Sequence, residues 1–211
     1  MKAQMKFQKY ICLAMIIVGA LGLLYAFCYS TGALSELGQS FEMVGSDKIS
    51  AFTPAPGKND ANLYTDIQGF NTMLMYFGIA MVLLAVLLYI TASNKRRNYY
   101  VSNYVSTGLC VGGNIVLSLV ALIMNAGWKS EFLNVDFAAW KQHYDNLEAI
   151  LGGSIERHYS ESTLWFDLGY AVYAIIIVAS LALLLNLIWK VMLMRGEKKL
   201  LASNELAGGV V

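Results

Sequence analysis

The sequence has no charged residue inside any of its four long apolar runs. Only 14% of its 211 residues are charged, whereas 57% are hydrophobic and the mean hydropathy is +0.53. A soluble domain carries about a quarter charged residues. The charge-free stretches are residues 10–29, 71–93, 104–126 and 168–189. Proton- and ion-coupled transporters usually need ionisable groups at membrane depth, so their absence argues against such an activity.

Cysteine is scarce, and none of the three cysteines lies in a long polar loop. Cys12, Cys28 and Cys110 fall in or beside apolar runs, which excludes a disulfide framework in the loops and a zinc-binding pattern. The HExxH, GxSxG, P-loop and GxGxxG motifs are all missing. We therefore expect no catalytic residue, no metal and no cofactor.

The two histidines, His143 and His158, share one polar segment with several acids. Their spacing matches no metal motif, so we favour solvated loop residues. A membrane enzyme acting on lipid would have only His158, Asp167 and their neighbours to use. It ranks last among our hypotheses, because no pair of nucleophile and base is present.

The apolar runs are long enough to cross a bilayer. Residues 10–29 would span about 30 Å as a helix, the thickness of a hydrocarbon core. A secretory signal peptide is the competing interpretation, which we disfavour because no A-x-A site follows and the run is long. The predicted spans are residues 10–29, 70–93, 104–128 and 164–194. The connecting segments are residues 30–69, 94–103 and 129–163, with a tail at 195–211.

A short cationic loop predicts the orientation of these spans. Lys95, Arg96 and Arg97 lie between the second and third spans, and the positive-inside rule makes such a loop cytoplasmic. Both termini are then cytoplasmic, and the two long connecting segments are outside. Ten of the fifteen lysines and arginines then lie inside: Lys2, Lys6, Lys9, Lys95, Arg96, Arg97, Lys190, Arg195, Lys198 and Lys199. The predicted fold is an all-α integral membrane protein, an antiparallel four-transmembrane-helix bundle forming a single domain.

The second outer segment contains a predicted amphipathic helix at residues 137–151. Its stripe consists of Phe137, Trp140, Tyr144, Leu147 and Leu151. Spacings of three and four residues place these side chains within a sector of about 80°. Aromatic residues are rarely left exposed, so the stripe should cover its own loop, the bilayer surface or another protein. The first four are candidate partner-binding residues.

The predicted spans also contain small and polar residues. Gly108 and Gly112 form a GxxxG motif, which lets two helices approach closely, either inside this bundle or with a partner span. Asn114 and Asn186 are the candidate intramembrane polar residues. They would form interhelical hydrogen bonds or, in an oligomer, line a pore.

The predicted topology is similar to that of claudins and tetraspanins, which have four spans, internal termini and two outer loops. The Trp-Gly-Leu-Trp and paired cysteines of claudin-like first loops are missing, as is the Cys-Cys-Gly of tetraspanin second loops. The outer segments also lack N-x-[ST] sequons. Together with the lack of loop cysteines, this favours a bacterial cytoplasmic membrane.

These features lead us to expect a non-catalytic accessory or scaffolding subunit of a larger membrane complex, with a transporter assembly as one host. Its partners would be the lipid bilayer and other membrane subunits or a second copy. A net charge of +1 gives no field that would attract nucleic acid. The alternative is an oligomeric channel or carrier for a neutral small solute, using Asn114 and Asn186.

Overall fold

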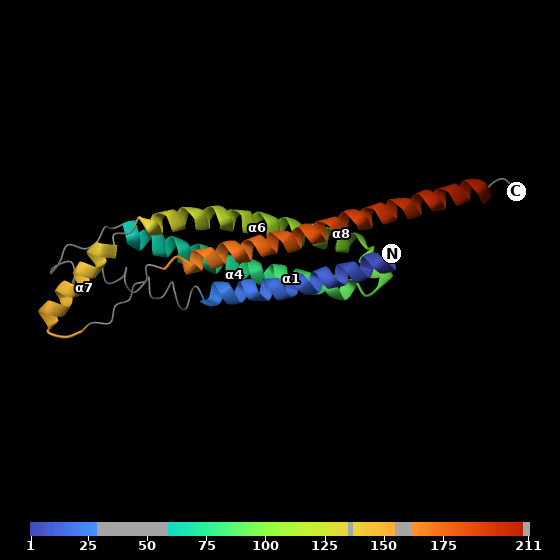
Figure 1. Ribbon diagram of the computed structural model, residues 1–211. Coiled ribbons are helices and arrows are strands. Elements are labelled where there is room, and N and C mark those ends of the chain that lie inside the picture. Colours follow the sequence, from blue (N-terminus) through green and yellow to red (C-terminus); the bar gives the residue numbers. More distant parts are fainter. Residues whose placement is uncertain (29–58, 135–136, 155–161, 209–211) are drawn as a thin grey trace. The chain divides into compact units, whose positions relative to one another are not determined.

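The computed structural model describes residues 1–28, 59–134, 137–154 and 162–208 (Figure 1). Its helices are α1 (Lys2–Cys28), α4 (Asn59–Thr91), α5 (Lys95–Asn98), α6 (Val101–Leu133), α7 (Phe137–Leu151) and α8 (Leu164–Gly208). Four of the described helices, α1, α4, α6 and α8, are long and apolar enough to span a membrane. The prediction of a helical chain with four candidate spans is confirmed. The side of the membrane on which each terminus lies stays a prediction.

All four long helices extend beyond the predicted spans at one or both ends, α4 and α8 the furthest. α4 begins at Asn59, within the predicted outer segment 30–69, because residues 59–69 contain no proline and continue a helical spacing of apolar side chains. α8 continues through the predicted tail to Gly208, a stretch rich in strong helix formers. The bounds of α7 coincide with those predicted. Residues 30–58 lie outside the described part.

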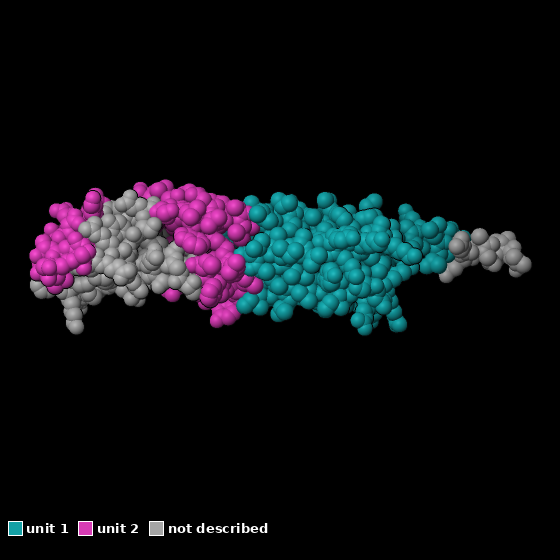
Figure 2. Space-filling view, turned by 60° about the horizontal axis from the view of Figure 1, so that its bottom comes forward, with its two compact units in different colours: residues 1–21, 78–119, 173–211 teal, residues 22–77, 120–172 magenta. Residues whose placement is uncertain are grey.

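The chain divides into two compact units (Figure 2). Each of the four long helices contributes one stretch to each unit. Unit 1 comprises residues 1–21, 78–119 and 173–211. Unit 2 comprises residues 22–77 and 120–172.

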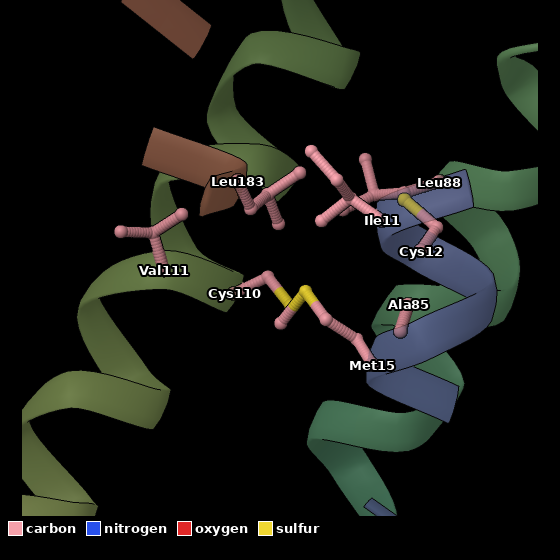
Figure 3. Close-up of a cluster of buried hydrophobic side chains, with 8 residues drawn as sticks. All are labelled: Ile11, Cys12, Met15, Ala85, Leu88, Cys110, Val111 and Leu183. Carbon is pink, nitrogen blue, oxygen red and sulfur yellow. The ribbon is translucent and has the colours of Figure 1, made fainter. Parts of the chain in front are cut away.

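An apolar core holds the four helical stretches of unit 1 together (Figure 3). Each helix provides at least one side chain that is 0% exposed: Cys12 from α1, Leu88 from α4, Cys110 from α6 and Leu183 from α8. The other members are Ile11, Met15, Ala85 and Val111. Sulfur-containing and aliphatic side chains fill such irregular gaps well, and their packing in a membrane depends on dispersion contacts.

Helices α4 and α6 run antiparallel within unit 1. Thr91, at the end of α4, accepts a hydrogen bond from the amide of Asn103, near the start of α6. Further along, Met81 of α4 lies beside Gly113 of α6. Residue numbers therefore fall along α4 as they rise along α6, as the predicted antiparallel arrangement requires.

Main-chain carbonyls accept hydrogen bonds between the helices of unit 2. The three bonds run from Tyr25 to Trp165 (2.8 Å), from Asn71 to Ala26 (3.0 Å) and from Asn125 to Phe166 (2.9 Å). Aromatic rings add contacts, with Phe132 and Phe166 at a centroid separation of 5.3 Å. Each side-chain donor is thereby satisfied without water, which a membrane interior requires.

Gly19 of α1 lies against Val82 of α4 in unit 1. A Cβ added there would lie 2.6 Å from Cγ2 of Val82, whereas one added at Gly112 would meet no described atom within 4 Å. We expect Gly19→Ala to lower the stability by about 1–3 kcal/mol relative to Gly112→Ala, because it overpacks the contact. Both substitutions gain the same helix propensity, so the comparison isolates packing. Thermal unfolding in detergent micelles measures it, and equal midpoints would contradict the close approach.

Candidate functional site

Six polar side chains lie buried together at the end of unit 1 that contains the N-terminus. They are Gln4 and Gln8 of α1, Asn98 of α5, Asn103 of α6, and Asn186 and Lys190 of α8. Asn103 is 4% exposed and the other five are 0% exposed. We call this group the amide cluster. Buried polar side chains are costly unless they are hydrogen-bonded, so their partners decide what the cluster does.

Gln4 is the most connected member of the amide cluster. Its Nε2 donates to Oε1 of Gln8 and to Oδ1 of Asn186, both at 3.1 Å. Its Oε1 accepts from Nδ2 of Asn98 at 2.9 Å and from the hydroxyl of Tyr99 at 3.2 Å. Burial raises the pKa of the Tyr99 phenol, and the charge of Glu197 adds to this, so the hydroxyl keeps its proton and donates. One side chain thus links α1 with α5 and α8.

Lys190 is a buried cation without a carboxylate partner among the described residues. Its Nζ donates to Oδ1 of Asn103 and, at 3.4 Å, to Oε1 of Gln8. It also lies over the rings of Tyr104 and Tyr99, at 4.8 and 6.0 Å from their centroids. Amide oxygens and ring faces solvate an ammonium group partially but do not neutralise its charge.

The amide cluster retains unused hydrogen-bonding capacity. Nε2 of Gln8, Oδ1 of Asn98 and the hydroxyl of Tyr104 are buried and have no partner among the described residues. A donor, an acceptor and a group that can serve as either therefore remain unpaired at this end of unit 1. Such groups suit water or a small polar ligand.

Helical spacing explains how the sequence brings these residues together. Gln4, Gln8 and Cys12 recur every four residues, and Asn186 and Lys190 are also four apart, so each set lies on one helix face. On α1 the polar residues simply continue the buried stripe. This continuity was the sequence signal that could have predicted the burial of Gln4 and Gln8, which precede the predicted first span.

The structure adds a feature of Lys190 that the sequence does not predict. Lys190 directly follows the charge-free run that ends at Trp189, and its side chain is completely buried. Its burial depends on Gln8 and Asn103, which come from other helices, so no local pattern predicts it. Its predicted place among the cytoplasmic cations stays a prediction.

The two predicted intramembrane amides have different surroundings. Asn186 belongs to the amide cluster and also donates to Oε1 of Gln8 at 3.3 Å. Asn114 is half-buried and donates to the sulfur of Cys110, one turn earlier on its own helix, at 3.6 Å. No hydrogen bond within the described part joins Asn114 to the amide cluster.

The predicted GxxxG motif lies on an open face of α6. A Cβ at Gly108 or at Gly112 would meet no described atom within 4 Å. Gly113 next to the motif is different, because a Cβ there would lie 2.9 Å from the sulfur of Met81. Close packing inside unit 1 therefore uses Gly113, and the motif itself is left without a described neighbour.

The predicted stripe of α7 is described at Tyr144 and Leu151 only. Tyr144 is 1% exposed, so its ring is buried within unit 2, whereas Leu151 is 69% exposed. The side chains of Phe137, Trp140, Leu147 and His143, together with residue His158, lie outside the described part. Their role as a partner-binding stripe stays a prediction.

The three cations of the predicted orientation signal occupy α5, which is capped by Asn94. Lys95 pairs with Glu197 of α8 at 3.5 Å. Arg96 and Arg97 are exposed, and neither has a carboxylate partner within the described residues. Of the cationic loop, one charge is thus compensated and two are free to meet an anion.

Asp167, the acid next to the charge-free stretch 168–189, pairs with Lys129 and also accepts a hydrogen bond from Thr163 at 3.0 Å. These contacts hold a carboxylate at the start of α8, where it interacts favourably with the helix dipole. The described residues contain no group of three His, Cys, Asp or Glu side chains able to hold a metal ion.

No protein-family model, curated protein or solved structure gives a significant match to this chain.

Replacing Gln4 tests whether the amide cluster stabilises unit 1. We expect Gln4→Met to lower the unfolding midpoint in detergent, because Asn98 and Asn186 each lose a buried partner. Each orphaned group costs about 1–3 kcal/mol. The control is Lys6→Met, on the exposed side of the same helix. If both variants unfold at the wild-type temperature, the cluster does not hold the helices together.

Proposed function

We propose that this chain is a non-catalytic membrane subunit that acts by contact, holding other subunits of a larger membrane complex. The observation that carries the proposal is the open GxxxG face of α6. Gly108 and Gly112 have no described atom near the place of a Cβ, although such motifs serve close helix packing. A partner span could therefore approach the backbone of α6 at this point.

Aliphatic side chains flank the two glycines on the same face of α6. Val105, Leu109 and Val116 are 56%, 60% and 59% exposed. With 100° between successive residues, all three lie within about 60° of Gly112 around the helix. Two glycines bordered by exposed aliphatic residues let a second helix approach the backbone of α6 and pack against apolar side chains.

The proposed subunit lies in the plasma membrane, in a bacterial cytoplasmic membrane by our reasoning, with both termini cytoplasmic. The cation bias of the sequence supports this orientation.

Cysteine labelling tests this orientation. In a background whose three native cysteines are replaced by alanine, we expect Lys141→Cys to react with an impermeant maleimide in intact cells. Lys199→Cys should react only after the cells are permeabilised. Both positions are exposed in the structure, so both cysteines can react. The reverse labelling pattern would show that the orientation is opposite to the one proposed.

A larger side chain at Gly112 should release the partner. We expect Gly112→Ile to abolish co-purification of a stoichiometric membrane protein in mild detergent, because a branched side chain separates the helix backbones. Gly127→Ile is the matched control, since Gly127 also lies on α6 with no described atom within 4 Å of a Cβ. Quantitative mass spectrometry of the purified complexes compares the two variants.

Two results would count against the subunit proposal. If Gly112→Ile retains the same partner at the wild-type ratio, the α6 face is not the contact. If the chain purifies only as a homo-oligomer, the alternative of a channel or carrier for a neutral small solute gains weight. The unpaired buried groups of Gln8 and Asn98 favour that alternative, because they could bind a polar solute. Liposomes containing the homo-oligomer would then be assayed for solute flux.

A further inference from the structure

A pocket of about 540 Å³ lies in unit 1, where α4 ends, α5 forms the turn and α6 begins. Leu87 and Thr91 line it from α4, Arg96 and Arg97 from α5, and Ser102, Asn103 and Ser106 from α6. Tyr100 completes the wall. The pocket thus combines two guanidinium groups with several hydroxyl groups and one apolar side chain.

From this lining we infer that the pocket binds the phosphate headgroup of an anionic phospholipid through Arg96 and Arg97. Both side chains are exposed and lack a carboxylate partner in the described part of the chain. A guanidinium group presents planar paired donors that match two phosphate oxygens. Ser102 and Ser106 are four residues apart on α6, so their hydroxyls lie on one helix face and add donors.

The buried cation of the amide cluster strengthens the case for an anionic ligand. Asn103 is shared between the pocket wall and the cluster, because its Nδ2 donates to Thr91 and its Oδ1 accepts from Lys190. The Lys190 ammonium therefore lies directly behind the wall. An anion in the pocket would face three positive charges, those of Arg96, Arg97 and Lys190, that no described acid compensates.

The apolar side of the pocket distinguishes a lipid from a soluble phosphate. Leu87 is 47% exposed and shares one face of α4 with Leu83 and Ile90, which are 63% and 53% exposed. This face belongs to a helix apolar enough to span a membrane, so it would meet acyl chains. A headgroup in the pocket could therefore leave its acyl chain on α4, and basic pockets at membrane boundaries are known to hold such headgroups. The inference does not depend on the proposed partner of α6.

Lipid titration of the purified full-length chain tests this inference. Phosphatidylglycerol or phosphatidylcholine is added to the protein in detergent micelles, and binding is followed by native mass spectrometry. We expect selective binding of phosphatidylglycerol, weakened about tenfold or more in the double variant Arg96→Gln and Arg97→Gln, because charge-assisted hydrogen bonds are lost. The control, Lys198→Gln with Lys199→Gln, removes the same charge from an exposed part of α8 and should stay within about twofold of wild type.

A third variant separates the pocket from general charge attraction. Ser106→Phe keeps all cations but fills the space, and it should weaken phosphatidylglycerol binding as the double arginine variant does. Inorganic phosphate at millimolar concentration should not displace the lipid. The inference is overturned if the double arginine variant binds like wild type, if the control loses as much affinity, or if Ser106→Phe binds normally. Displacement by inorganic phosphate would assign the pocket to a soluble anion instead.

Discussion

The solvation of one buried ammonium group constrains the end of unit 1 that contains the N-terminus. Lys190 has no carboxylate partner in the described part of the chain, so Gln8, Asn103 and two tyrosine rings must surround it. Each of those groups comes from a different helix or turn than Lys190 itself. The cation is therefore solvated only where α1, α6 and the turn after α5 meet α8, and these directional contacts constrain their relative positions more than aliphatic packing would.

The sequence was sufficient for the four candidate spans, because hydropathy over some twenty residues reflects the membrane and not the neighbours. It was insufficient for the amide cluster. Gln4 and Gln8 lie among exposed lysines in a segment that composition marks as a basic terminus, and Lys190 follows an apolar run directly. Whether such residues face water or the bundle is decided by the side chains of other helices, which a single-sequence pattern does not contain.

The glycines show the same limit of local patterns. The GxxxG pair predicts close approach without specifying the neighbour, and the structure places the tight contacts at Gly19, Gly113 and Gly169 instead. Gly113 directly follows Gly112, so a rotation of about 100° around α6 separates a packed glycine from an open one. The motif was recognisable in the sequence, but its availability to another span depended on which face the apolar core of unit 1 occupies.

Asn103 connects the two polar features of unit 1, since one side chain lines the pocket and also holds Lys190. An anion bound by Arg96 and Arg97 would lower the electrostatic cost of the buried ammonium, and the ammonium would in turn raise the affinity for the anion. Such a coupling is reciprocal by thermodynamic necessity. The stability of the helix packing around Lys190 and the occupancy of the pocket then both depend on the attraction between the anion and the Lys190 ammonium. This end of unit 1 would then be most stable against unfolding in a membrane that supplies the anion.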